Sequence, residues 1–384
     1  MYGAGNVGRG FIGPMFSRAG FEVVFADINR FIIDALNERG RYKLTVAASP
    51  PYEIEVSGVR GVDGSDAQAV INEIASCELM AVSLGASAFQ NVAPIIAEGF
   101  LLRMKLTQDP LNILICENLK DSAETLRGWV SECLCSENKI LFENKCGLVE
   151  TAIGRMIPVA KNGCGGPLRV TVEEYDFLPA DAAAFVGSPP DVRGLILHSP
   201  FSFYEERKLY LHNMGHMICA SLGLRMGIET IDGAVSNPSV RLVTQGAMTE
   251  AAAMLSKKYG VPFIDIFNHA EDLLLRFGNK KLGDTCERVA RDPMRKLKAG
   301  DRLAGALVQC FEHGVYPAYV AAGYASALDS VTREKQKARE IATGIGGLEG
   351  EALELVMELF DGFDHESIIP RVEAAKKRFR GDMV

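Results

Sequence analysis

The chain has 384 residues, of which 48% are hydrophobic and 23% charged, and its formal net charge is −8. A chain of this length exceeds what one hydrophobic core usually holds, so we expect two domains. The negative charge argues against a nucleic-acid partner, which requires a basic surface. No apolar run reaches the roughly 18 residues of a membrane span, and no secretory leader is recognisable, so the sequence predicts a cytoplasmic protein without a membrane partner.

The nine cysteines favour reduced thiols and do not indicate a metal site. An odd number scattered over a long chain is typical of a cytosolic protein. Cys133 and Cys135 form the one close pair, and their spacing is not that of a CxxC motif. Because no HxxxH pattern is present either, we expect no zinc site and no other metal.

The first predicted elements are a glycine-rich turn and a helix. Residues 3–13 read Gly-Ala-Gly-Asn-Val-Gly-Arg-Gly-Phe-Ile-Gly, a helical pattern continues to Ala19, and an apolar strand over 21–26 ends at Asp27. This order is typical of the first half of a βαβ dinucleotide-binding unit. Pro14 is expected to kink the helix beyond its first turn. Only two residues precede the glycine turn, so the usual first strand is missing, and we expect a truncated or misplaced start.

The glycine turn and its acid predict an NAD site, although a turn that only packs a helix on a sheet would have similar glycines. Gly3 permits the tight turn, Gly5 lets the backbone approach a diphosphate, and Gly8 lets the helix pack close to the sheet. Asp27 would accept hydrogen bonds from the adenosine ribose and repel a 2′-phosphate, which favours NAD over NADP, and the nearby Arg30 weakens that preference. The predicted cofactor-binding residues here are Gly3, Ala4, Gly5, Asn6, Val7, Gly8 and Asp27.

Strand-like and helical runs alternate over the rest of the first half. We predict strands over 79–84, 111–116, 139–142 and 168–173 and helices over 89–102 and 122–134. Such alternation predicts an α/β, Rossmann-like, doubly wound domain with a mainly parallel sheet. The Pro-, Ala-, Asp- and Gly-rich stretch over 179–200 marks the change of domain. We therefore predict an NAD-binding domain over 1–195 and a mainly α-helical substrate and catalytic domain over 196–384, with long helices over 238–257 and 338–360.

Three polar residues near the start of the second domain suit alcohol chemistry. On an α-helix, Asn213 and His216 would lie about 140° and 80° around the axis from Lys208, so all three can meet one small substrate. A lysine beside an apolar wall can lose its proton at moderate pH, and Asn and His can bind an oxygen whose charge changes. A solvent-facing helix with a capping Asn fits the same spacing.

Several motifs in chain order resemble the mannitol dehydrogenase family of polyol-specific long-chain dehydrogenases, and within it the mannitol-1-phosphate 5-dehydrogenases. They lie at 3–13, 25–27, 111–113, 116–118, 206–208, 213–216 and 291–303. The resemblance implies a Rossmann domain followed by a helical domain, NAD as cofactor, no metal and a monomer. It also implies an enzyme that interconverts D-mannitol 1-phosphate and D-fructose 6-phosphate.

Carried over residue by residue, the resemblance implies that Lys208 is the general base. Asn213 and His216 would hold the substrate oxygen, and Asn118 would line the same pocket beside the cofactor. His212 has no counterpart in the family, and we interpret it as a packing or surface residue.

Two smaller points concern the neighbourhood of the base. Glu206 and Arg207 are expected to hold the helix of Lys208 in place. The family usually has an acid before the arginine that corresponds to Arg155, and Gly154 stands there in this chain. Either Glu150, one helical turn earlier, or water would have to relay the proton.

A sugar phosphate requires cations held in a fixed geometry. Arg276 and Asn279 match a substrate-lining stretch of the wider family, so Arg276 is our first choice. The remaining candidates are Arg295, Lys296 and Arg302, and basic residues between helices more often form ordinary ion pairs. The predicted substrate-binding residues are Asn118, Arg276, Asn279 and Arg295.

Other functions stay open. A related enzyme could act on unphosphorylated polyols or on uronates such as tagaturonate or fructuronate. A non-catalytic sensor of a nucleotide or sugar phosphate is favoured by Gly154 and by the missing strand. A metal-dependent alcohol dehydrogenase fits the sequence least.

Overall fold

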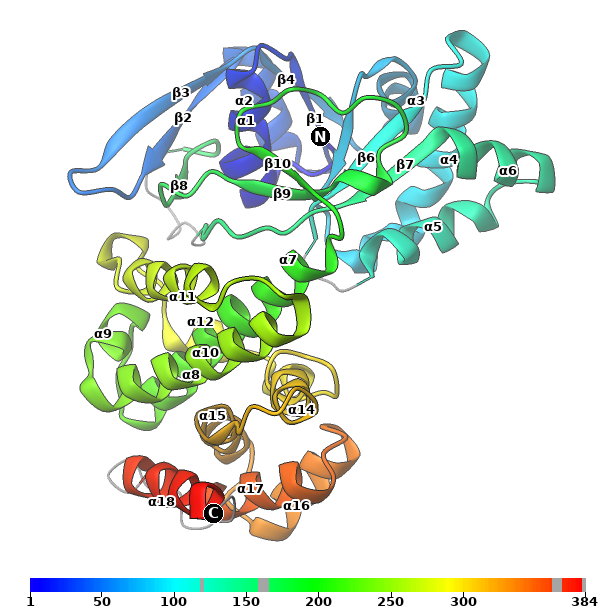
Figure 1. The fold of residues 1–384 in the computed structure, drawn as a ribbon. Helices are drawn as coiled ribbons and strands as arrows, with labels where there is room; N and C mark the ends of the chain where they lie inside the picture. The colour runs from blue at the N-terminus through cyan, green and yellow to red at the C-terminus, as the bar shows by residue number, and fades with distance from the viewer. Residues whose placement is uncertain (118–120, 158–165, 361–367, 382–384) are drawn as a thin grey trace. The chain divides into compact units, whose positions relative to one another are not determined.

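The computed structural model describes residues 1–117, 121–157, 166–360 and 368–381 (Figure 1). The chain divides into two compact units, Met1–Glu205 and Glu206–Val384. The expected change of domain after residue 195 falls at the start of strand β10 (Leu195–His198), which pairs with β9 (Leu178–Asp181) inside the first unit. None of the described helices combines the length and the apolar character needed to cross a bilayer.

A parallel sheet forms the centre of the first unit (Figure 1). Its strands are β1 (Val23–Asp27), β4 (Val59–Asp63), β5 (Met80–Val82), β6 (Leu111–Ile115) and β7 (Cys146–Glu150). β1 pairs with β4, and β6 lies between β5 and β7. Tyr2 forms parallel bridges to Ala26 of β1 and to Val82 of β5, which joins the two sets. The order β4–β1–Tyr2–β5–β6–β7 is that of a doubly wound dinucleotide-binding sheet, with Tyr2 in the place of the first strand.

The first strand is therefore not wholly missing, which corrects the expectation from the sequence. The amide of Tyr2 donates to the carbonyl oxygen of Ala81 at 2.8 Å, and the amide of Gly3 donates to the carbonyl oxygen of Ala26 at 2.8 Å. One short segment thus pairs with both neighbouring strands at their carboxyl ends. Buried backbone groups need such partners, and Tyr2 and Gly3 supply them where the glycine turn begins.

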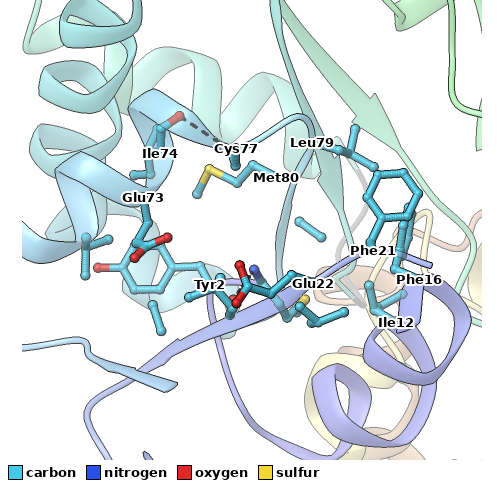
Figure 2. Close-up of a pocket in the computed structure, with 16 residues that line it drawn as sticks. Tyr2, Ile12, Phe16, Phe21, Glu22, Glu73, Ile74, Cys77, Leu79 and Met80 are labelled. Carbon is cyan, nitrogen blue, oxygen red and sulfur yellow. Dashed lines mark hydrogen bonds between the residues drawn. The ribbon is translucent and has the colours of Figure 1, made fainter. Parts of the chain in front are cut away.

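Met1 and Tyr2 line a cavity of about 110 Å³ in the first unit (Figure 2). The ammonium group of Met1 donates a 2.8 Å hydrogen bond to the carbonyl oxygen of Val24, and burial lowers its pKa. The apolar side chains that line the cavity include Ile12, Phe16, Phe21, Ile74, Leu79 and Met80. Glu22 and Glu73 also line this cavity, which we call the slot beside Met1 (Figure 2).

Helices cover both faces of this sheet. They are α1 (Gly13–Arg18), α2 (Arg30–Arg39), α3 (Ala67–Ser76), α4 (Phe89–Leu106), α5 (Ser122–Glu132) and α6 (Ser136–Lys145), with short 3₁₀ turns at Ala86–Ala88 and Ala182–Ala184. Side chains of β6 alternate between two cores, because Leu114 packs in one cluster and Ile113 and Ile115 pack in the other. This alternation is what a sheet buried on both sides requires.

The strand predicted over 139–142 is wrong, because these residues lie in α6. Phe142 is buried and its ring lies 5.1 Å from that of Phe100, whereas Ile140 is 65% exposed. The apolar residues 140–142 therefore belong to a helix, in which Phe142 faces the core and Ile140 faces solvent. The strand of this region is β7, which follows directly after α6. A second sheet consists of β3 (Tyr52–Ser57), β2 (Arg41–Val46) and β8 (Val170–Val172). β8 confirms the strand predicted over 168–173, whereas β2 and β3 were missed from the sequence.

The described part of the second unit is helical and is built around α15 (Ala318–Asp329), whose residues are almost all buried. α15 packs on α8 (Met214–Arg225), α10 (Pro238–Tyr259) and α17 (Gly350–Phe360). The other helices are α7 (Ser202–Arg207), α9 (Ile231–Ser236), α11 (Phe263–Phe277), α12 (Cys286–Ala290), α13 (Pro293–Lys296), α14 (Ala304–Glu312), α16 (Lys335–Gly344) and α18 (Ile368–Gly381), with a 3₁₀ turn at Lys280–Leu282.

The single helix predicted over 338–360 is wrong, because it consists of α16 and α17. Gly347 between them has φ +60°, a left-handed conformation that ends an α-helix. The apolar period continues on both sides of this break, so the sequence pattern alone predicts one helix.

Candidate active site

The glycine turn joins Tyr2 to a π-helix, η1 (Gly8–Ile12). Gly3 has φ +104°, and a Cβ placed on it would lie 2.2 Å from the carbonyl oxygen of Ser83. A Cβ on Gly8 would lie 2.2 Å from the carbonyl oxygen of Gly3, so Gly8 packs on the turn itself. Gly5 differs, because no described atom comes within 4 Å of its Cβ position. Gly3 thus allows close contact with the segment after β5, Gly8 allows close contact inside the turn, and Gly5 borders open space.

Asp27 is held in place by the glycine turn. Its Oδ2 accepts the amide of Ala4 at 2.7 Å, and its Oδ1 accepts the amide of Asn29 at 2.8 Å. A carboxylate can accept about four hydrogen bonds, so each oxygen keeps capacity for a further donor. Asp27 therefore has a fixed position and spare acceptors at the carboxyl end of β1.

The helix after the turn begins as η1 and continues as α1. The amide of Gly13 donates to the carbonyl oxygen of Gly8, which is the spacing of a π turn. Pro14 lies in the first turn of α1, where the missing amide of a proline costs least. The helix thus changes from π to α geometry at the position where a kink was expected. Arg155 donates a 3.2 Å hydrogen bond to the carbonyl oxygen of Gly10 and so anchors η1.

Glu117 connects the ends of two strands. Its Oε1 accepts the amides of Leu84 at 2.7 Å and Gly85 at 2.9 Å, in the loop after β5. Burial raises the pKa of Glu117, although the two amides oppose this shift. Asn118, which we predicted to bind cofactor and substrate, lies outside the described residues.

Glu150 lies at the end of strand β7 and not on a helix, which corrects the premise that it stands one helical turn before Gly154. Its carboxylate accepts the hydroxyl of Ser122 at 2.9 Å and the amide of Ala123 at 2.5 Å. Burial raises its pKa against the effect of these donors. Glu150 therefore caps the amino terminus of α5, and its geometry does not mark it as a replacement for the missing acid.

Lys208, Asn213 and His216 do not share one α-helix. Lys208–Asn213 form a six-residue π-helix, η4, between α7 and α8. The α-helical angles expected from the sequence are therefore wrong over this segment, because a π turn takes up more residues. Lys208 begins η4, Asn213 ends it, and His216 lies in the first turn of α8. π-helices are rare and often occur at functional sites.

His216 contacts an acid that the sequence-based prediction missed. Its Nε2 lies 3.1 Å from Oδ2 of Asp284, and its ring stacks on Phe277 with the centroids 4.8 Å apart. Arg288 donates two 2.6 Å hydrogen bonds to the same carboxylate. Burial alone would raise the pKa of Asp284, but His216 and Arg288 keep it below its ordinary value. The i,i+4 spacing of Asp284 and Arg288 was the available sequence signal.

The imidazole of His216 is neutral at neutral pH, because burial lowers its pKa more than Asp284 raises it. Its Nε2 is buried, and within the described part of the chain no group is aligned with it for a hydrogen bond. A neutral imidazole nitrogen either donates or accepts. Because Nε2 also lies 3.1 Å from Oδ2 of Asp284, the imidazole is oriented by that carboxylate.

Two more histidines and Arg276 lie nearby. His212 is buried, with its ring centroid 6.0 Å from that of His216 and 5.8 Å from that of Phe277, so it is a packing residue. Burial and then the charge of Arg276 lower its pKa. His269, which was missed from the sequence, has a pKa lowered to about 3 by burial and by the neighbouring arginines, one of which is Arg276. The charge of Arg276 thus lowers the pKa of both histidines.

Arg295 and Arg302 both contact Asp301. Arg295 pairs with Asp292 at 2.9 Å and lies 3.7 Å from Asp301, and its side chain is 46% exposed. Arg302 pairs with Asp301 at 2.8 Å and is only 15% exposed. The charge of Arg302 also lowers the pKa of His216, after that of Arg288.

Lys296 and Asn279 have structural contacts. Lys296 is buried and donates to the carbonyl oxygens of Val289 and Arg291, and burial lowers its pKa to about 8. Asn279, predicted to bind substrate, accepts the amide of Lys281 at 3.1 Å and so caps the 3₁₀ turn after α11.

Glu206 fixes the segment that carries the base. Its Oε1 accepts a 2.8 Å hydrogen bond from Lys258 of α10. This contact is the positioning role expected of it. In the described ranges, no group of three or more His, Cys, Asp or Glu side chains is arranged to hold a metal ion.

Two family models match consecutive parts of this chain. Residues 1–194 match the mannitol dehydrogenase Rossmann domain, and residues 201–346 match the mannitol dehydrogenase C-terminal domain. The chain belongs to the mannitol dehydrogenase family. It is thus an oxidoreductase of that family, and the fold class predicted from the sequence is confirmed.

Solved structures of similar fold include two polyol dehydrogenases. The substrate-free structure of D-sorbitol dehydrogenase has a TM-score of 0.80 at 14% identity, and the match covers 97% of this chain and 93% of that one. The Pseudomonas fluorescens mannitol 2-dehydrogenase, solved as a ternary complex with NAD and D-mannitol, has a TM-score of 0.77 at 14% identity, with 98% and 93% covered. At this identity, the likeness establishes the fold that this mannitol dehydrogenase family member shares with them.

Proposed function

We propose that this chain is an NAD-dependent dehydrogenase that interconverts D-mannitol 1-phosphate and D-fructose 6-phosphate. The observation that carries the proposal is η4, the π-helix that begins at Lys208 and ends at Asn213, followed in the first turn of α8 by His216, which Asp284 orients. A base and two groups that can bind an oxygen are the chemistry that alcohol oxidation needs. The family to which the chain belongs and the NAD complex of the mannitol 2-dehydrogenase support the same reaction class.

The first unit fits NAD. Gly5 borders open space where a diphosphate can approach the backbone, and Asp27 has spare acceptors for the ribose hydroxyls. The amides at the start of the following helix are the natural donors for the diphosphate. When bound, NAD supplies the acceptor for the hydride that leaves C5 of the polyol phosphate.

The second unit carries the proton chemistry. In the oxidation direction, the uncharged Nζ of Lys208 takes the proton of the C5 hydroxyl as the C–H bond breaks and the C=O bond forms. The side-chain amide of Asn213 and the imidazole of His216 bind the oxygen as its charge develops. In the reverse direction the Lys208 ammonium returns the proton. Asp284 and Arg288 keep the ring of His216 in position.

For the phosphate we propose two arginines, Arg276 and Arg302, whose charges act on the histidines of this unit. Arg276 is 11% exposed and acts on the pKa of both His212 and His269. Arg302 acts on the pKa of His216. A phosphate dianion favours a guanidinium fork of this kind. Arg295, which is half exposed, is a weaker candidate for the same role.

The first experiment measures NADH oxidation by the purified full chain with fructose 6-phosphate, fructose and tagaturonate. We expect fructose 6-phosphate to be reduced with the highest kcat/KM. Preference for fructose or tagaturonate would contradict the phosphate specificity and favour the rival enzymes. Ligand-induced stabilisation without turnover of any of these substrates would favour the sensor.

The second experiment tests the base. Lys208→Ala should lower kcat by about 10²–10⁴-fold and leave NADH binding unchanged, and added methylamine should restore part of the activity. The matched control is Lys337→Ala, which changes an exposed lysine on α16 and should leave kcat unchanged. Equal activity of Lys208→Ala and wild type would overturn the assignment.

The third experiment tests the phosphate site. Arg276→Ala should raise the KM for fructose 6-phosphate by at least tenfold and leave NADH binding unchanged, because a charge-assisted contact to the phosphate is lost. Arg295→Ala tests the weaker candidate in the same way, and we expect a smaller rise in KM. A larger effect of Arg295→Ala would move the phosphate to that residue.

A further inference from the structure

Two carboxylates stand side by side at the edge of the sheet where the dinucleotide is proposed to bind. β1 and β4 are parallel neighbours, and Asp27 pairs in register with Asp63 at their carboxyl ends. The strands remain close beyond this pair, because the amide of Gly64 donates to the carbonyl oxygen of Asp27 at 2.9 Å. A Cβ on Gly64 would lie 2.8 Å from the carbonyl carbon of Asp27. Asp63 is thus fixed beside the residue that meets the ribose.

Asp63 is held by the loop that follows it. Its Oδ1 accepts the amide of Ser65 at 3.0 Å and also the Ser65 hydroxyl. These hydrogen bonds keep the pKa of Asp63 below its ordinary value, and the pair with Arg30 acts in the same direction. The carboxylate is therefore charged at any pH at which the enzyme would be assayed.

The other oxygen of Asp63 contacts Arg30. The distance from Oδ2 to NH2 of Arg30 is 2.6 Å, and the arginine side chain is otherwise 72% exposed. Arg30 is the first residue of α2, directly after the turn that holds Asp27. An arginine near this acid is the kind of group that accommodates the 2′-phosphate of NADP. In this chain the guanidinium of Arg30 is paired with Asp63, and this pairing opposes its binding of a 2′-phosphate.

We infer that Asp63 is a second determinant of the preference for NAD over NADP, acting as a positioning residue through Arg30. This inference rests on the proposed function and goes beyond it. Asp27 disfavours a 2′-phosphate directly by its own charge. Asp63 adds a second negative charge at the same edge and keeps the nearby cation occupied. The two carboxylates therefore convert a segment with an NADP-type arginine into one that selects the 2′-hydroxyl.

The experiment compares NADH and NADPH binding to the purified full chain by the fluorescence of the bound nucleotide. In Asp63→Asn, the amide oxygen can still accept the Ser65 amide, so the loop is preserved while the charge is removed. We expect the ratio of the NADPH to the NADH dissociation constant to fall about tenfold. Most of this gain should disappear in the double variant Asp63→Asn/Arg30→Ala. Arg30→Ala alone should leave NADH binding unchanged.

An unchanged ratio in Asp63→Asn, or a gain that survives removal of Arg30, would overturn the inference. Failure of the wild-type protein to bind either nucleotide would overturn both the proposed cofactor and this inference. Binding of NADH without reduction of fructose 6-phosphate would overturn the proposed substrate alone, since the readout does not depend on turnover.

Discussion

The imidazole of His216 lies 3.1 Å from the carboxylate of Asp284, which two hydrogen bonds from Arg288 hold in place. Asp284→Asn removes the charge and keeps the shape. We expect kcat/KM for fructose 6-phosphate to fall by about 10–100-fold, because the ring loses a charged contact that orients it. The pKa of His216 should fall further, since Asp284 is a group that raises it. Steady-state kinetics and NMR titration of the histidines measure the two effects.

The matched control is Asp265→Asn, which changes an exposed acid in the first turn of α11. Equal kinetics for Asp284→Asn and Asp265→Asn would show that the carboxylate contact has no part in the reaction.

Two glycines of the turn separate cofactor binding from folding. A Cβ at Gly5 meets no described atom within 4 Å, so Gly5→Ala should leave Tm unchanged and weaken NADH binding by at least tenfold, because the methyl group blocks the diphosphate. A Cβ at Gly8 would lie 2.2 Å from the carbonyl oxygen of Gly3, so Gly8→Ala should lower Tm as well. Thermal unfolding and nucleotide fluorescence distinguish the two. Unchanged NADH affinity in Gly5→Ala would place the diphosphate elsewhere.

Glu250 should make the helical unit less stable at alkaline pH. Burial raises its pKa to about 8, although the amides of Tyr319 and Val320 donate to its carboxylate and oppose the shift. In the unfolded chain its pKa returns to about 4.3. The folded state thus holds a proton that the unfolded state releases, and this contribution to stability is lost as pH rises through about 8.

The variant Glu250→Gln should lack this pH-dependent loss of stability, because glutamine does not titrate. Its Tm should fall less between pH 6 and pH 9 than that of the wild type, by about 3–6 °C. The side-chain oxygen of glutamine can still accept the two amides. Parallel Tm curves for the two proteins would contradict the prediction.

The slot beside Met1 should accept added strand residues. Extending the chain ahead of Met1 by Ala-Val-Ile would fill the apolar cavity and pair with β1, whereas Gly-Ser-Gly would do neither. Burial of two aliphatic side chains should raise Tm by about 5 °C relative to the Gly-Ser-Gly extension. Equal melting temperatures of the two extended proteins would show that the slot is closed to a strand.

Local features were the ones that could be predicted from the sequence. The glycine turn and Asp27 were found because backbone conformation and hydrogen bonding within a short segment require those residue types. Tyr2 was not recognised as part of the sheet, because two residues are too few to show a period. Its pairing depends on β1 and β5, which follow much later in the chain.

Features that depend on distant pairing or on rare backbone geometry could not be predicted in the same way. Asp284 contacts His216 from a different element, and a single sequence does not show which acid a histidine will meet. The sequence predicts an α-helix in place of η4, because the residues of a π-helix have the same apolar character as those of an α-helix and show no distinct period. Lys208 and Asn213 were therefore identified by residue type, while their geometry was not.

The two π-helices, η1 and η4, make the length of these segments as important as their side chains. A π turn holds one residue more than the α turn it replaces. Removing one residue from within 209–212 would let the chain continue as an α-helix, and each α-helical residue turns by about 100°. Lys208 would then be rotated away from Asn213 and His216, although all three side chains would still be present. A relative with a one-residue deletion in this segment would thus keep Lys208, Asn213 and His216 and lose their relative positions.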